Sequence, residues 1–139
     1  GATFTVRVLS YRPEIKLMTE GGQWRGQMRL GVSAELREEL TPTYFMEPAR
    51  LKQLERALAE ALGQDLTSAL RYTQEMGADV FGFGWWLYRR QPLRWFAVRE
   101  HWDRIYENLP VDVQVEVRVR AEGMTVKSPL LPAAPGGDR

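Results

Sequence analysis

The sequence predicts an α+β domain, in which helices pack on one face of a mainly antiparallel sheet of about four strands. Alternation of apolar and polar residues, typical of half-buried strands, fills much of the first forty residues and recurs near 111–120. Between these regions, apolar residues recur at helical spacing. The expected order is therefore β-β-β-α-α-α-β, in one domain over residues 1–126, with a Pro/Gly-rich tail over 127–139.

Three strands are expected before the first helix. The first begins at Phe4 and is expected to end near Pro13, because proline has no N–H to donate to a strand ladder. A short second strand is expected over 15–18 and a third over 28–37. The Gly21-Gly22 pair accepts positive φ angles, so these two strands should form a hairpin.

Three helices are expected to follow. Pro48 suits a first helical turn and Gly77 a helix end, which predicts a helix of about thirty residues. A second helix should run from Asp79 to Pro92, and a third from there to about residue 108. Valine at every odd position from 111 to 119 predicts a last strand with one buried face.

Composition excludes several classes of function. With 19 Lys+Arg against 18 Asp+Glu, the chain lacks the basic excess typical of nucleic-acid-binding domains. The absence of cysteine excludes disulfides, thiolate metal sites and a cysteine nucleophile. The single histidine, His101, has no evident partner for acid–base chemistry, so a structural or surface role is expected. We predict no catalytic residue, no metal site and no cofactor.

Asp79, Gly82 and Gly84 form the first motif of interest. A dinucleotide fingerprint needs a third glycine where Leu87 stands, so a phosphate-binding loop is not expected. We expect both glycines to let a helix pack closely against its neighbour. Asp79 is expected to cap that helix rather than to bind a ligand.

A dense aromatic and basic cluster follows this motif. Such a cluster can form a helix core, anchor a protein interface, or stack on bases or sugars. The adjacent Trp85 and Trp86 cannot share one helix face, so at least one should lie at a core edge or in an interface. With Arg89 and Arg90 they are the possible interface residues. The cluster comprises Trp85, Trp86, Tyr88, Arg89, Arg90, Arg94 and Trp95.

Residues 77–123 resemble the C-terminal region of the Ger(x)C spore-germination proteins. The shared features are D-[IV]-[FL]-G-F-G, a basic helix that ends in proline and tryptophan, a W-[DE] pair and an alternating valine strand that closes near Gly123. The strands and the long helix before them also fit the family's layout, so the resemblance extends over residues 3–126. The signature residues are Asp79, Gly82, Gly84, Pro92, Trp95 and Trp102.

The resemblance implies a C-terminal domain of the C subunit of a germinant receptor. Such subunits are lipoproteins anchored at the spore inner membrane beside other receptor subunits, and no enzymatic activity is associated with them. The expected function is thus a non-catalytic part in nutrient-triggered germination through protein–protein contacts, without nucleic acid. The lipid anchor would lie N-terminal to this chain. The alternative is a small-ligand (germinant) or nucleic-acid binding module that uses the Trp/Arg cluster.

Overall fold

A computed structural model describes residues 4–38 and 47–121 of the chain. The α+β class and the separation of strands from helices are confirmed, while the tail over 127–139, Gly123 and Phe4's side chain lie outside what is described. The elements in chain order are β1 (Phe4–Glu20), β2 (Gln23–Glu38), α1 (Pro48–Met76), α2 (Phe83–Arg90), α3 (Pro92–Val98), the 3-10 turn η1 (Arg99–His101), α4 (Trp102–Glu107) and β3 (Val111–Arg120).

The sheet has three strands in the order β1-β2-β3, so the expectation of four was wrong. Residues 4–20 form one continuous strand that contains Pro13, with a register shift between Val8 and Ser10. An edge strand tolerates proline, because an N–H that points away from the sheet has no ladder partner to lose. The expected hairpin is present, with Gly21 and Gly22 at φ 60° and 82°.

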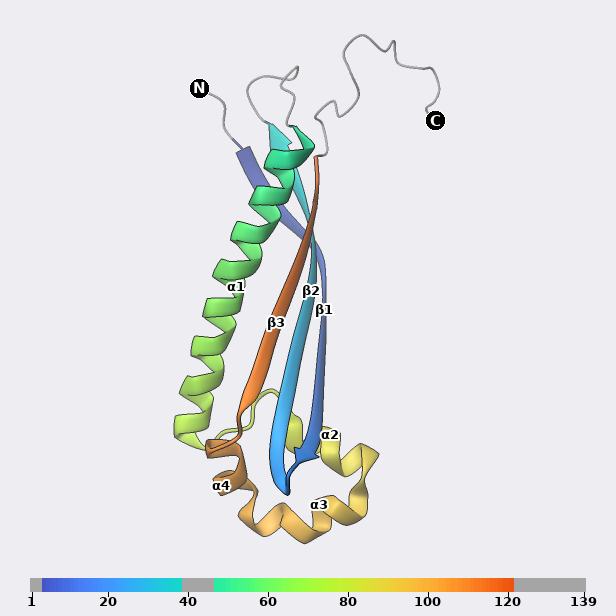
Figure 1. Cartoon of the computed structure of the whole chain (residues 1–139), viewed down its shortest axis with the longest axis vertical. Helices are drawn as coiled ribbons and strands as arrows, with labels where there is room; N and C mark the ends of the chain where they lie inside the picture. Colours follow the sequence, from blue (N-terminus) through green and yellow to red (C-terminus); the bar gives the residue numbers. More distant parts are fainter. Residues whose placement is uncertain (1–3, 39–46, 122–139) are drawn as a thin grey trace.

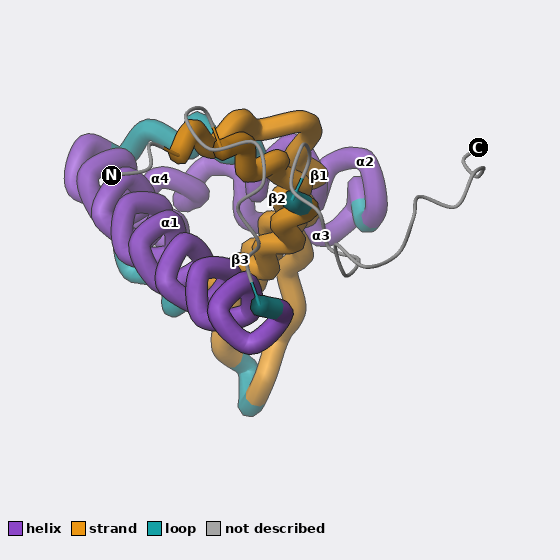
Figure 2. Tube along the Cα trace, turned by 90° about the horizontal axis from the view of Figure 1, so that it is seen from above, coloured by secondary structure: helices purple, strands orange, loops and turns teal. Residues whose placement is uncertain are grey.

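The last strand makes the sheet mixed rather than mainly antiparallel. β3 pairs with β2 in parallel, from Gly26 opposite Val111 to Glu35 opposite Arg120. A parallel pair needs a crossover connection, which α1 to α4 supply here. Helix α1 packs along β3 on one side of the sheet, as Figures 1 and 2 show. The Val119 amide donates to Glu55 Oε2 of α1 at 2.8 Å, which satisfies one donor on that strand.

Two apolar clusters hold the layers together. The upper one joins alternate residues of β2 and β3, such as Val32, Ala34 and Val117, to the leucines of α1. The lower one lies where α2 to α4 close the hairpin end of the sheet (Figure 1). It is formed by Leu17, Met28, Leu70, Phe83, Leu87, Trp102, Tyr106 and Leu109.

The expected third helix, 92–108, is broken into α3, η1 and α4. Residues seven apart in a straight helix are separated by about 10 Å along its axis. The rings of Trp95 and Trp102 instead meet edge to face, with centroids 5.6 Å apart. The break lets this segment bend around the start of α2, which periodicity alone did not reveal.

Side chains near the C-terminal end of α1 tie it to the link between α4 and β3. Gln74 Nε2 donates to the backbone oxygens of Tyr106 and Leu109 at 2.9 and 2.8 Å. Thr73 Oγ1 and the Tyr106 hydroxyl are 2.7 Å apart. Gly77 then ends the helix in the left-handed conformation at φ 69°, as expected from the sequence.

Candidate interaction surface

Asp79, in the link between α1 and α2, organises the start of α2. Its Oδ1 accepts from the amides of Gly82 and Phe83 at 3.0 and 2.9 Å. Its Oδ2 accepts from the Gly84 amide at 2.6 Å and from Trp102 Nε1 at 3.0 Å. The first N–H groups of a helix have no hydrogen-bond acceptor within the helix. The Asp79 carboxylate supplies acceptors for three amides at the start of α2. Asp79 therefore acts as a helix cap that also holds the Trp102 indole.

The two glycines of the motif meet different requirements. A Cβ on Gly84 would lie 2.8 Å from Trp102 Nε1 and 3.0 Å from Trp95 Cζ3, so the close packing expected there is present. At Gly82 that expectation was wrong, since a Cβ would meet only Trp85 Cβ at 4.0 Å. Gly82 instead has φ 86°, which side-chain-bearing residues rarely adopt.

Four of the six signature residues thus form one cluster, which we call the latch: Asp79, Gly84, Trp95 and Trp102. Gly82 precedes it in the turn, and Pro92 occupies the first turn of α3, where its missing N–H leaves no bond unmade. The latch fixes the direction of α2 relative to α3 and α4.

Helix α2 divides the four possible interface residues between two surfaces. Trp86 is half-buried, with the Arg90 guanidinium carbon 5.4 Å from its ring centroid. Both residues line a hollow of about 460 Å³ beside the hairpin strands. Trp85 and Arg89 are exposed elsewhere on the helix. The other residues of the hollow are Pro13, Glu14, Ile15, Lys16, Gln27 and Arg29.

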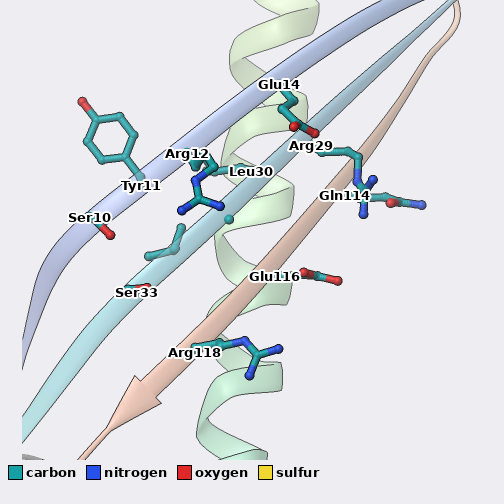
Figure 3. A pocket seen from close by; sticks show the side chains of 12 residues that line it. Ser10, Tyr11, Arg12, Glu14, Arg29, Leu30, Ser33, Gln114, Glu116 and Arg118 are labelled. Atoms are coloured by element: carbon teal, nitrogen blue, oxygen red, sulfur yellow. The ribbon is translucent and has the colours of Figure 1, made fainter.

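A second hollow, of about 470 Å³, lies on the face of the sheet opposite α1 (Figure 3). Gly31 of β2 lies in its lining between Arg12 of β1 and Glu116 of β3. A Cβ on Gly31 would have only the Arg12 backbone oxygen near it, at 4.0 Å, so the glycine leaves this position open. We call these polar lining residues the open face: Ser10, Arg12, Glu14, Arg29, Ser33, Gln114, Glu116 and Arg118.

Ion pairs lie toward the two ends of this side of the sheet. At one end the buried Glu35 carboxylate, 3% exposed as a residue, accepts from Arg7 at 2.9 Å. At the other, Arg25 lies 3.5 Å from Asp112. Within the described part of the chain, the charged groups of the open face make no ion pair within 4.0 Å: Arg12, Glu14, Arg29, Glu116 and Arg118.

The two hollows adjoin each other, because Glu14 and Arg29 line both. We call the combined surface the trough: the open face together with Trp86 and Arg90. It offers unpaired charges of both signs beside one partly buried indole. Tryptophan and arginine are the side chains most enriched in the energetic centres of protein interfaces. The trough therefore contains side-chain types that are enriched in such centres.

Over residues 4–38 and 47–121, no three metal-binding side chains of the His, Cys, Asp or Glu type are grouped together. His101 is exposed on η1.

Burial raises the pKa of the Tyr106 hydroxyl, the Asp79 charge adds to that rise, and the hydrogen bond with Thr73 opposes it. No helix in the described ranges has the length and hydropathy of a membrane span.

Sequence reasoning missed the open face and two exposed apolar residues, Leu93 and Phe96. Alternation predicts a polar side for each of the strands 28–37 and 111–119, but not which strands lie beside it. Pairing those positions across three strands could have placed Arg29 and Gln114 side by side. That step needed the parallel pairing of β2 with β3, which alternation within one strand does not reveal.

Comparison with known proteins agrees with this geometry. The family model described as "Spore germination B3/ GerAC like, C-terminal" matches residues 1–123. Spore germination protein KC of Bacillus subtilis (strain 168) is 30% identical over 84 residues, which are 60% of this chain and 21% of that protein. The crystal structure of the GerBC protein superposes with a TM-score of 0.71 at 19% identity, over 86% of this chain and 37% of that one.

These comparisons differ in what they establish. At 19% identity, the likeness to GerBC shows the fold alone. The chain also spans only a fifth of the length of the protein KC that it matches. The family model, however, covers all of the described residues and the whole signature from Asp79 to Trp102. The chain therefore belongs to the spore germination B3/GerAC-like C-terminal domain family.

Proposed function

We propose that this domain is a non-catalytic part of the C subunit of a germinant receptor, and that its trough binds another subunit of the receptor. Family membership supports the link to spore germination. A lipid anchor N-terminal to this chain would hold the whole protein at the spore inner membrane. The domain would then contribute to nutrient-triggered germination by keeping receptor subunits in contact.

The observation that carries this proposal is the set of unpaired charges in the trough. Arg12, Arg29 and Arg118 alternate with Glu14 and Glu116 across three strands, without an ion pair among the described residues. A partner protein with charges of both signs can satisfy such a pattern, and charge complementarity fixes the register of the contact. Nucleic acid fits poorly, because its phosphates would meet the two glutamates.

The alternative of a small germinant bound at the Trp/Arg cluster has less support. Trp86 faces a hollow, but Trp85 and Arg89 do not line it, so the cluster does not converge on one cavity. Small-molecule sites are usually concave and mostly apolar, whereas the trough is wide and mostly polar.

The test is a calorimetric titration of this domain against soluble parts of its cognate receptor subunits. We expect saturable binding that weakens about tenfold in Arg118→Glu, because reversing an interfacial charge places like charges together. Arg56→Glu reverses an exposed charge on α1, outside the trough, and should bind like the parent. The same titration with candidate germinants should give no heat. Germinant binding without subunit binding would make the domain a sensor and overturn the proposal.

A further inference from the structure

Four large apolar side chains are exposed together on α2 and α3. Trp85 is 62% exposed, Tyr88 41%, Leu93 83% and Phe96 50%. The Trp85 and Tyr88 rings lie 5.5 Å apart, and the Tyr88 and Phe96 rings meet edge to face at 6.2 Å. Leu93 precedes Phe96 by three residues and so lies on the same side of α3. We call these four residues the ridge.

The ridge is exposed because the same helices use other residues for the core. In α2, Phe83 and Leu87 are fully buried, which turns Trp85 and Tyr88 away from the sheet. The latch supports this orientation through the close packing at Gly84 and the hydrogen bond from its amide to Asp79. Contiguous exposed apolar patches of this kind mark interaction sites.

Two arginines lie beside the ridge. The Arg99 guanidinium carbon lies 5.3 Å from the Phe96 ring centroid, and Arg89 is exposed one helical turn after Trp85. The other two arginines of these helices, Arg90 and Arg94, lie over the Trp86 and Trp24 rings instead. The ridge thus combines apolar rings with the positive charges of Arg89 and Arg99.

The helices that carry the ridge lie away from the chain ends of the described domain (Figure 1). Helix α3 forms one end of the elongated molecule, and the chain enters and leaves the described domain at the other end (Figure 1). A planar partner can therefore reach α2 and α3 without being blocked by the chain ends. The trough extends along the sheet instead, so one molecule could use both surfaces at once.

We infer that the ridge docks on the surface of an anionic lipid bilayer. Tryptophan and tyrosine favour the boundary between headgroups and acyl chains, where one side of the ring is apolar and the other is wet. Leu93 and Phe96 add apolar surface to insert, and Arg89 and Arg99 stand ready for anionic headgroups. The ridge would thus orient the domain on the membrane, a role beyond the proposed contact between subunits.

Vesicle sedimentation with tryptophan fluorescence tests this inference on the domain as it stands. We expect binding to vesicles of phosphatidylcholine with phosphatidylglycerol, weaker binding to phosphatidylcholine alone, and loss of binding at high salt. Trp85 is exposed, whereas Trp24, Trp86, Trp95 and Trp102 are half-buried or buried. A blue shift on binding should therefore come from Trp85 and be absent from Trp85→Phe, even at lipid concentrations high enough for the variant to sediment with vesicles.

Matched variants separate the apolar and electrostatic contributions to vesicle binding. Leu93→Ser should weaken binding about tenfold, whereas Tyr72→Ser, which removes an exposed ring from α1, should leave it unchanged. Arg89→Gln should weaken it about fivefold, and Arg71→Gln on α1 should have little effect.

Failure to bind anionic vesicles would overturn the inference, and so would equal loss in the ridge and α1 variants. Ridge variants that bind vesicles normally but lose a receptor subunit would assign the ridge to a protein partner instead. Arg118→Glu, in the trough, should keep vesicle binding. The two proposals can therefore fail separately.

Discussion

At the scale of single residues, the latch combines four hydrogen bonds and close packing at the start of α2. One carboxylate, Asp79, takes four hydrogen bonds, three from the start of α2 and one from the indole of Trp102. Gly84 is the point of closest approach between the helices, because two indoles pack where its side chain would be. A motif that could suggest a ligand site in sequence is thus occupied by the protein's own groups.

The latch predicts a large cost for a small change. In Gly84→Ala the added methyl would lie 2.8 Å from Trp102 Nε1, so the indole or α2 must shift. We expect the free energy of unfolding to fall by about 1–3 kcal/mol, measured by chemical denaturation. Gly63→Ala in α1 is the control, since its nearest contact would be an ordinary 3.8 Å. It should be neutral or stabilising by about 0.5–1 kcal/mol, and an equal loss in both variants would contradict the close-packing explanation.

Tyr106 predicts how stability depends on pH. Burial, aided by the charge of Asp79, raises the pKa of its hydroxyl above the ordinary value, so the folded state favours the neutral form. Its contribution should be complete below about pH 10 and should be lost as the pH rises toward the folded-state pKa, because only the unfolded chain ionises readily. Urea unfolding between neutral and strongly alkaline pH would measure this loss. The slope should flatten in Tyr106→Phe, and an unchanged slope would show that other groups cause it.

At the scale of elements, α1 is unevenly anchored. Its first half packs half-buried leucines, such as Leu54 and Leu58, against β2 and β3. Toward its end, Leu70 is fully enclosed in the lower cluster, and Thr73 and Gln74 bond to the α4–β3 region. The helix is therefore held most firmly where it meets the latch-bearing end of the molecule.

Amide hydrogen exchange should reveal this difference. Segments with fewer buried contacts open more often, so we expect residues 48–58 of α1 to exchange faster than residues 66–76. Mass spectrometry of peptides from the two halves measures it within one sample. Equal protection along α1 would mean that the half-buried leucines and the Glu55 bond to Val119 hold the first half just as well.

At the scale of the whole molecule, the open side of the sheet is mostly polar, whereas α2 and α3 expose apolar rings. The sheet uses one face for α1 and leaves the central part of the other to the trough. Helices α2 to α4 close the hairpin end of the sheet (Figure 1). The ridge residues on α2 and α3 are exposed. A domain arranged in this way can meet a protein along its length and a planar surface at its end.

Local patterns in the sequence determined much of this domain. Alternation located the β strands, and leucine spacing with Gly77 predicted α1 and its end, because each pattern depends on neighbours in the chain. The Asp79 carboxylate accepts from the first amides of α2 as expected, although that helix begins at Phe83 rather than at Asp79. The signature from Asp79 to Trp102 also identified the family, which the family model confirms.

Only the tertiary structure decided the rest, because it depends on residues far apart in sequence. Pro13 looked like a strand end until β1 proved to be an edge, and the parallel β2–β3 pairing assembled the open face from three separated segments. The break between α3 and α4 likewise follows from two indoles that pack on Gly84. Periodicity shows which sides of a helix or strand are apolar. Which apolar side remains exposed, as at the ridge, depends on where the neighbouring elements pack.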